Sequence, residues 1–405
     1  MKLGVVGLGY VGSVTAAVLA SKGNSVIGVD IDRHRIESFA SGKLPFYEPN
    51  LKETLKNAGK NIQFTTDYSY LKGCAAVFVC VATPSINGRI SLKYVQDACE
   101  SIKQNFPDTA IIMKSTVIPG TAGELSSLTG MKIISNPEFT REGTAIHDTL
   151  FPDRVVVGAR EQEDFELARK IWNFIDSEFI ETTNENAELI KYASNSFLAT
   201  KISFINEFAN LCEKIPNADV STVAKGMGLD PRIGKDFLRA GIGYGGSCFP
   251  KDTEAIATYA RDAGEKLSIV ESAISANSER ENRIADICTT SLGKGLRGAM
   301  ICVLGLSFKE DTDDLRESKS LKLVSLLSNK GASVKVFDPV VKNLDITNRC
   351  DTINECLDGT DMAVVATEWP QFSEMLSGYN GIVVDARRTV KPESVKKYVG
   401  VGRHT

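Results

Sequence analysis

Short apolar runs alternate with longer amphipathic segments through the first half of the chain. The runs at 25–29, 75–81, 110–113, 132–135 and 154–157 follow a first apolar run at residues 2–6, and each has the length of a buried strand. Helical patterns lie between most of them. Strands that alternate with helices predict a parallel, doubly wound α/β sheet with right-handed crossovers.

The pattern becomes helical after residue 185. Leu189, Tyr192, Ala193, Phe197 and Ile205 recur near helical spacing and predict one long helix over 186–214. Its length suggests a connecting helix that also forms a dimer interface. Further helices are expected at 13–21, 253–263 and 268–290.

From about residue 295, short apolar runs reappear, as in the first half of the chain. Apolar runs at 299–305, 334–337, 359–367 and 381–385 resemble the earlier strands, and Asp338 follows its strand as Asp30 follows 25–29. We therefore expect two Rossmann-like doubly wound domains, at 1–185 and 295–405, joined by a central helical domain at 186–294.

Charge and cysteine usage narrow the functional class. The formal net charge of -4 argues against a general binder of nucleic acid or anionic membranes. The nine cysteines show no CxxC pair or Cys/His cluster, so we expect no metal site and no disulfide framework, which fits a reducing cytoplasm. No apolar run reaches the length of a membrane span.

A dinucleotide fingerprint follows the first predicted strand. Gly7, Gly9 and Gly12 form GxGxxG, with Tyr10 and Val11 inside it, before a helix and a second strand that ends at Asp30. The first glycine allows a tight turn, the second a close approach to the pyrophosphate, and the third close packing of helix on strand. The carboxylate at position 30 favours NAD over NADP. Arg33 and Arg35 line the adenosine edge or face solvent, and the remaining alternative is a glycine-rich turn in another kind of α/β protein.

Polar residues follow three predicted strands. They are Thr83-Pro84, Ser115-Thr116 and Asn136-Pro137-Glu138. Each alone is more often a cap or a turn. Because ligands gather at the carboxyl ends of parallel strands, three together predict a binding site.

The segment 241–252, GIGYGGSCFPKD, concentrates candidate chemistry. Its glycines suit backbone that passes close to a ligand or adopts positive φ. If a helix begins near Phe249 or Pro250, its N-terminal field favours the thiolate of Cys248. The alternative is a tight turn with an incidental buried cysteine.

Several motifs in order resemble the UDP-glucose/GDP-mannose dehydrogenase family over nearly the whole chain. They are GLGYVG, FYEP at 46–49, KST at 114–116, NPEFTREG at 136–143, Lys191 with Asn195, GYGGSCFPKD, and FKEDTDDLRES at 308–318. The resemblance implies NAD-dependent oxidation of the primary alcohol of a nucleotide sugar to a carboxylate, with a UDP-sugar as substrate and a homodimer as assembly. Members that act on N-acetylmannosamine often carry histidine where Ser247 stands.

The resemblance also implies roles for single residues. Cys248 matches the nucleophile, with Lys191, Asn195, Asp252, Thr116 and Glu138 as its catalytic partners. Cofactor contacts are implied for Thr83, Thr116, Glu142, Lys251 and Arg316, beside the fingerprint and Arg35. Substrate contacts are implied for Phe139, Arg141, Phe237, Leu238, Arg239, Ala240, Gly241, Gly245, Lys309 and Arg387, besides Glu138, Lys191 and Asn195. Arg232 is expected to cross to the neighbouring subunit's substrate, and Arg388 is an alternative to Arg387.

Two other functional classes stay open from the residues. A non-catalytic nucleotide-sugar-binding protein would keep the fold without the chemistry. A two-domain hydroxyacid dehydrogenase would leave Cys248 and the third domain unexplained.

Overall fold

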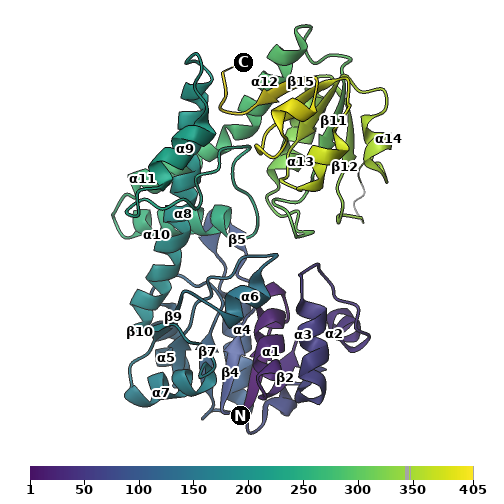
Figure 1. Ribbon diagram of the computed structural model, residues 1–405. Coiled ribbons are helices and arrows are strands. Elements are labelled where there is room, and N and C mark those ends of the chain that lie inside the picture. The colour runs from purple at the N-terminus through teal and green to yellow at the C-terminus, as the bar shows by residue number, and fades with distance from the viewer. Residues whose placement is uncertain (343–345, 347, 405) are drawn as a thin grey trace. The chain divides into compact units, whose positions relative to one another are not determined.

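The computed structural model describes residues 1–342, 346 and 348–404, and it divides into two compact units, Met1–Ser194 and Asn195–Thr405 (Figure 1). No helix within that described part of the chain is long and apolar enough to cross a membrane. Each unit contains one large sheet with helices packed on it.

The first unit is built on an eight-stranded sheet. Its strands are β1 (Lys2–Val6), β2 (Ser25–Val29), β3 (Ile62–Thr65), β4 (Ala76–Val79), β7 (Ala110–Met113), β8 (Ile133–Ser135), β9 (Arg154–Gly158) and β10 (Glu178–Thr182). Their order is β10-β9-β8-β7-β4-β1-β2-β3, and all neighbours are parallel except β8 and β9. The order reverses between β1 and β4, which is where doubly wound sheets bind ligands.

Helices cover this sheet (Figure 1). They are α1 (Tyr10–Ser21), α2 (Arg33–Ala40), α3 (Leu51–Ala58), α4 (Lys93–Asn105), α5 (Thr121–Thr129), α6 (Ala145–Leu150), α7 (Gln162–Ile171) and the first part of α8 (Asn184–Cys212), with short 3-10 turns at Gly59–Asn61 and Tyr68–Leu71. A small antiparallel hairpin joins β5 (Ser85–Ile86) to β6 (Arg89–Ile90). The strands are apolar on both faces because helices bury both, as for Val5 and Val79.

The second unit combines a helical part with a five-stranded parallel sheet. Its strands are β11 (Met300–Leu304), β12 (Ser333–Phe337), β13 (Met362–Val365), β14 (Ile382–Asp385) and β15 (Lys397–Gly400), in the order β12-β11-β13-β14-β15. Besides the rest of α8, its helices are α9 (Val220–Gly228), α10 (Phe249–Asp262), α11 (Ser268–Ser278), α12 (Arg280–Leu292), α13 (Lys319–Asn329), α14 (Ile353–Leu357), α15 (Gln371–Met375) and a 3-10 turn at Pro392–Ser394.

The α/β fold with two doubly wound sheets is confirmed. The similar sequence patterns of the two halves, each with an aspartate after its second strand, have a physical basis. Asp30 accepts the N–H of Leu8 at 2.7 Å, and Asp338 accepts the N–H of Leu306 at 2.7 Å. In each sheet, an acidic residue after the second strand therefore holds the turn after the first.

One helix prediction is wrong in its length. The segment 268–290 forms two helices, α11 and α12, with Glu279 between them. The backbone carbonyl of Asn277 accepts the ammonium of Lys319 at 2.8 Å. Because a lysine satisfies a carbonyl near the end of α11, the helix can stop there; periodicity does not reveal this contact, which comes from a residue far along the chain.

The expectation about cysteines is wrong for one pair. Cys302 on β11 and Cys356 on α14 form a disulfide, with their Cα atoms 5.6 Å apart. The two are 54 residues apart in sequence, and packing of α14 on β11 brings them together. The described residues hold no group of three or more His, Cys, Asp or Glu side chains arranged to hold a metal ion.

Candidate active site

The fingerprint glycines differ in the reason why a side chain is excluded. A Cβ on Gly12 would lie 1.8 Å from the carbonyl oxygen of Gly7, and one on Gly7, which has φ +89°, would lie 2.9 Å from the backbone of Cys80. A Cβ on Gly9 would meet nothing within 4 Å. The turn thus packs through Gly7 and Gly12 and leaves open space at Gly9, the N-cap of α1, where a pyrophosphate fits.

Asp30 is buried at the end of β2 and closes this turn. Its Oδ2 accepts Leu8 N–H and lies 3.0 Å from Arg35 Nη1. Arg35 thus pairs with Asp30, whereas Arg33 is exposed and pairs with Glu37. Arg35 is therefore the arginine placed beside the carboxylate that is predicted to hold the ribose.

A pair of glycine substitutions separates packing from ligand approach. We expect Gly12→Ala to lower the melting temperature sharply, because its methyl group overlaps the backbone of Gly7. Gly9→Ala should fold with wild-type stability, since the space is open, but should bind NAD+ at least about tenfold more weakly if the pyrophosphate approaches there. Calorimetry with NAD+ measures both; equal NAD+ affinity for Gly9→Ala and wild type would contradict the assignment.

Other predicted cofactor residues surround the same edge of the first unit. Thr83 is buried in the loop after β4, and Val11 lies in the first turn of α1. The hydroxyl of Tyr10 accepts the N–H of Gly143 at 2.8 Å. Tyr10 therefore connects the fingerprint helix to the segment that carries Glu142.

Glu138 and Lys191 form a buried ion pair. Lys191 Nζ lies 2.9 Å from Glu138 Oε1, and Thr140 donates to Glu138 Oε2 through its N–H and hydroxyl, both at 2.6 Å. Burial raises the pKa of Glu138, but Lys191 and the Thr140 hydrogen bonds outweigh burial and leave the pKa below its usual value. Phe139 lies beside the pair, with Lys191 Nζ 5.4 Å from its ring. The structure thus brings together two predicted catalytic residues.

A second buried ammonium, that of Lys114, lies near this pair. Its Nζ donates to the backbone and side-chain oxygens of Asn136 at 3.3 Å, and Trp172 donates to the same side chain. Burial lowers the pKa of Lys114 to about 8; Glu138 nearby opposes that shift and Lys191 adds to it. Lys114 therefore contributes to the charge balance around Glu138. The KST motif does not predict this role.

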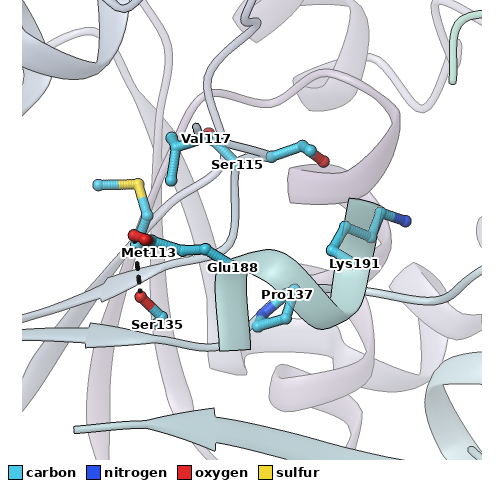
Figure 2. A pocket seen from close by; sticks show the side chains of 8 residues that line it. Met113, Ser115, Val117, Ser135, Pro137, Glu188 and Lys191 are labelled. Carbon is cyan, nitrogen blue, oxygen red and sulfur yellow. Dashed lines mark hydrogen bonds between the residues drawn. The ribbon is translucent and has the colours of Figure 1, made fainter. Parts of the chain in front are cut away.

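A small cavity lies at the carboxyl ends of β7 and β8 (Figure 2). It is lined by Met113, Ser115, Thr116, Val117, Ser135, Pro137, Glu188 and Lys191. Two of the three predicted polar strand ends, 115–116 and 136–138, contribute residues to it. Thr116 is therefore placed on the same cavity as Lys191.

In the second unit, Cys248 is the N-cap of α10 and is exposed. Pro250 occupies the first turn, where a missing N–H costs nothing. The Ser247 hydroxyl lies 3.6 Å from the Cys248 sulfur. The helix begins at Phe249, four residues before the start expected at 253, so the condition for an N-terminal field at Cys248 is met.

Asn195 and Asp252 are also brought together. Asn195 Nδ2 donates to Asp252 Oδ2 at 2.7 Å, and Lys251 Nζ lies 2.6 Å from Asp252 Oδ1. Asp252 is one turn into α10 from Cys248 and only 1% exposed. A buried carboxylate with two donors is fixed in position.

The glycine-rich loop before Cys248 is dense in glycine because it packs against backbone of its own unit. A Cβ on Gly241 would lie 2.5 Å from the Ala386 carbonyl, and one on Gly245 would lie 2.3 Å from the Glu317 carbonyl. Arg280 donates twice to the Gly241 carbonyl, at 2.9 and 2.8 Å. At Gly241 and Gly245, therefore, the loop backbone passes close to other protein backbone, whereas the sequence predicted a close approach to a ligand.

The segment 237–241 leads into this loop, and Arg239 is its one exposed residue. Phe237 adopts φ +62°, which is unusual for a bulky residue, and the side chains of Leu238 and Ala240 are buried. Arg239 donates to the Arg387 carbonyl at 2.9 Å. Strain of this kind gathers at functional sites.

The two candidate arginines after β14 have different partners. Arg387 donates to the carbonyls of Ala366, Gly243 and Phe308 and pairs with Glu368. Arg388 instead pairs with Asp219 at 2.6 Å. Arg387 therefore lies beside the loop that carries Lys309, whereas Arg388 is occupied on another side.

Three predicted arginines are exposed and form ion pairs. Arg141 pairs with Asp148, Arg232 with Asp230 and Arg316 with Asp314. The arginine side chains of these pairs lie at the surface, so a charged ligand can reach them.

Positioning residues were the main omission of sequence reasoning. Glu48 accepts the N–H groups of Gly143 and Ala145, and Asn277 bonds both backbone groups of Tyr244. Glu48 lies in the FYEP motif, so the sequence could have predicted its role. For Asn277 the signal is absent, since its role depends on a loop 33 residues away.

A doubly wound sheet with an NAD-type glycine turn, together with an exposed cysteine capping a helix and two fixed acid–base clusters, defines a dinucleotide-dependent dehydrogenase. Family models match the chain over residues 1–176, 185–279 and 302–392, described as the NAD binding, central and UDP binding domains of the UDP-glucose/GDP-mannose dehydrogenase family. The chain belongs to that family, and its cofactor is NAD.

Relatives and solved structures agree with this assignment. The chain is 39% identical to UDP-glucose 6-dehydrogenase of Rickettsia felis, over 99% of this chain and 96% of the relative. It is 38% identical to UDP-glucose 6-dehydrogenase TuaD of Bacillus subtilis, over 92% and 85%. A UDP-glucose dehydrogenase structure from Pyrobaculum islandicum superposes with a TM-score of 0.94 at 34% identity, over 99% of this chain and 98% of that one.

Proposed function

We propose that this chain oxidises UDP-glucose to UDP-glucuronate, and that Cys248 carries the reaction covalently. The observation that supports this most directly is the exposed Cys248 at the start of α10, one turn before the buried Asp252. The names of the relatives at 39% and 38% identity support glucose as the sugar. A simple alcohol dehydrogenase has no need of such a cysteine.

NAD+, which the fingerprint turn, Asp30 and Arg35 would hold, would supply the hydride acceptor for both oxidations, so one sugar would consume two NAD+ and one water and release three protons. A water held by Asp252, or Lys191 after it has lost a proton to become the neutral amine, takes the hydroxyl proton in the first step. Cys248 Sγ then attacks the aldehyde carbon to form a thiohemiacetal, whose oxidation leaves a thioester. Lys191 and Asn195 stabilise the oxyanions.

Hydrolysis completes the proposed reaction. Water activated beside Glu138 and Thr116 attacks the thioester carbon, and the carbon–sulfur bond breaks to release the acid and the thiolate. Substrate binding is assigned to the segment 237–241, Gly245, Lys309 and Arg387, with Arg141 and Phe139 on the sugar side. Arg316, Lys251 and Glu142 are assigned to the cofactor, with the fingerprint, Arg35, Thr83 and Thr116.

The test is NADH formation with UDP-glucose, UDP-N-acetylmannosamine and GDP-mannose. We expect UDP-glucose to give the highest kcat/KM and two NADH for each acid. One NADH with released aldehyde would leave a two-electron dehydrogenase. Binding of nucleotide sugars without NADH would leave the non-catalytic alternative.

We also propose that the chain forms a homodimer through α8. Phe197, Phe204, Phe208 and Leu211 are exposed, lie 7, 4 and 3 residues apart, and thus share one helix face. A continuous exposed apolar face suits a second copy. Arg232 is assigned to the partner's substrate.

Mixing two inactive variants tests both parts of the dimer proposal. If Arg232 serves the partner's site, Arg232→Ala and Cys248→Ser should each lose turnover and regain part of it when refolded together, because one site of the mixed dimer is complete. Phe204→Glu should give a monomer in sedimentation, whereas Leu128→Glu, another exposed apolar position on α5, should not. No recovery on mixing would contradict the role of Arg232.

We assign three domains, at 1–185, 186–294 and 295–405, which the three matched family models support. We also place the chain in the cytoplasm, because the reaction needs Cys248 as a thiolate and an oxidising compartment would oxidise it. The Cys302–Cys356 disulfide opposes this placement, although both of its cysteines are fully buried.

A further inference from the structure

A buried carboxylate on α8 completes the start of another helix. Glu188 is 4% exposed; its Oε2 accepts the N–H of Gly120 at 2.6 Å and its Oε1 accepts that of Ala122 at 2.9 Å. Helix α5 has Gly120 as N-cap and no side-chain cap of its own. Glu188 thus supplies, from 68 and 66 residues along the chain, acceptors that the first turn would otherwise lack.

This cap fixes the loop that carries Thr116. The loop 114–120 joins β7 to α5, and it ends at the N–H that Glu188 accepts. Thr116, Glu188 and Lys191 line one cavity of about 10 Å³, close to the least space that holds a water molecule. In Figure 2 the carboxylate of Glu188 points to Ser135, with the hydrogen bond drawn, while the ammonium of Lys191 points the other way.

One turn of α8 therefore serves two sides of the cavity. Lys191 pairs with Glu138, and Glu188 holds the opposite loop. Because both side chains come from a rigid helix, the distance between the Thr116 loop and the Lys191 ammonium depends on the contacts that Glu188 makes.

The carboxyl of Glu188 changes charge near neutral pH. Burial raises its pKa from 4.5 to about 7, against the hydrogen bonds from Ala122 and Gly120, and Glu185 on the same helix raises it further. Helix α5 faces it with backbone N–H groups, β8 with the Ser135 hydroxyl, and Lys191 shares its cavity. A protonated carboxyl carries hydrogen on one oxygen, so it accepts one N–H less well.

We propose that Glu188 is a positioning residue for Thr116: its ionised carboxylate holds both N–H groups at the start of α5 and thereby keeps the 114–120 loop in the arrangement that turnover requires. The proposal rests on the proposed function, because it takes Thr116 as a residue that acts at the reacting carbon. It adds a residue that touches neither substrate nor cofactor.

Glu188→Gln keeps the shape and removes the charge. In wild type, kcat should rise between about pH 6 and about pH 8 as the carboxyl ionises. In Glu188→Gln, kcat should be about tenfold lower at about pH 8 and nearly flat, with KM for UDP-glucose within about twofold. The matched control is Glu185→Gln, one turn earlier and exposed, which should keep the rise and move it slightly to lower pH.

Stability provides the readout that separates positioning from a structural role. Since the pKa of Glu188 is raised on folding, its contribution to stability is present below pH 4.5 and is lost as pH rises through about 7. Wild-type turnover should thus rise while this contribution falls, and the melting temperature of Glu188→Gln relative to wild type should increase with pH. Turnover and stability that fall together would indicate a structural role alone and overturn the proposal.

A measurement on the wild-type protein needs no variant. Hydrogen exchange at Gly120 and Ala122, corrected for the intrinsic pH dependence, should slow from about pH 6 to about pH 8 as the cap forms. The inference is contradicted if exchange is unchanged over that range. It is also contradicted if the Glu188→Gln enzyme keeps the wild-type pH profile. Absence of NADH from every sugar would instead refute the proposed function and leave the exchange result standing.

Discussion

Replacement of Cys248 by serine should abolish acid formation, with kcat lowered by about a thousandfold or more, because the hydroxyl is a far weaker nucleophile than the thiolate. Affinity for NAD+ and UDP-glucose should stay near wild type, since Cys248 is exposed and fills no core position. Stopped-flow NADH traces and calorimetry measure the two quantities. Full turnover by Cys248→Ser would remove the covalent step from the mechanism.

Alkylation gives an independent check on the same sulfur. Burial raises the pKa of each of the other six cysteines outside the disulfide, namely Cys74, Cys80, Cys99, Cys212, Cys288 and Cys350. Iodoacetamide at neutral pH should therefore label one site per folded chain and stop turnover at that stoichiometry, and UDP-glucose should protect it. Cys248→Ser is the control and should take up no label.

Lys191→Met should lose both turnover and stability. Removal of an oxyanion donor costs roughly a hundredfold to a thousandfold in kcat. The buried Glu138 is left without its ammonium, which costs about 3 to 5 kcal/mol in the free energy of unfolding. Urea titration and steady-state kinetics measure the two losses.

The double variant Lys191→Met/Glu138→Gln separates these effects. With both charges removed, stability should recover most of its loss, because no uncompensated charge stays buried. Turnover should not recover. In wild type, the pKa of Glu138 lies below its usual value, so the stability it contributes is present above the ordinary carboxyl range and is lost as pH falls. A double variant that is as unstable as Lys191→Met would contradict this reading.

Local pattern was enough for the doubly wound architecture. Segments such as 25–29 and 110–113 matched their strands residue for residue, since a strand buried on both faces is a short apolar run whatever its neighbours are. The fingerprint turn also followed from local rules, because glycine conformations depend on a few adjacent residues.

Contacts between distant segments stayed hidden. The strands β3, β10 and β15 and the hairpin β5/β6 were missed, since edge and surface strands lack a continuous apolar run. Lys319 donates to the Asn277 carbonyl near the end of α11, and the disulfide joins Cys302 to Cys356 across 54 residues. No local pattern carries such information.

Residue types and their order thus determined the fold class, the cofactor turn, the candidate nucleophile and, through shared motifs, the family. Tertiary structure alone decided which charges meet: Glu138 with Lys191, Asp252 with Asn195 and Lys251, and Glu188 with the first turn of α5. The reason is physical, because the energy of a buried charge depends on donors and on loss of water, and packing of distant segments supplies both.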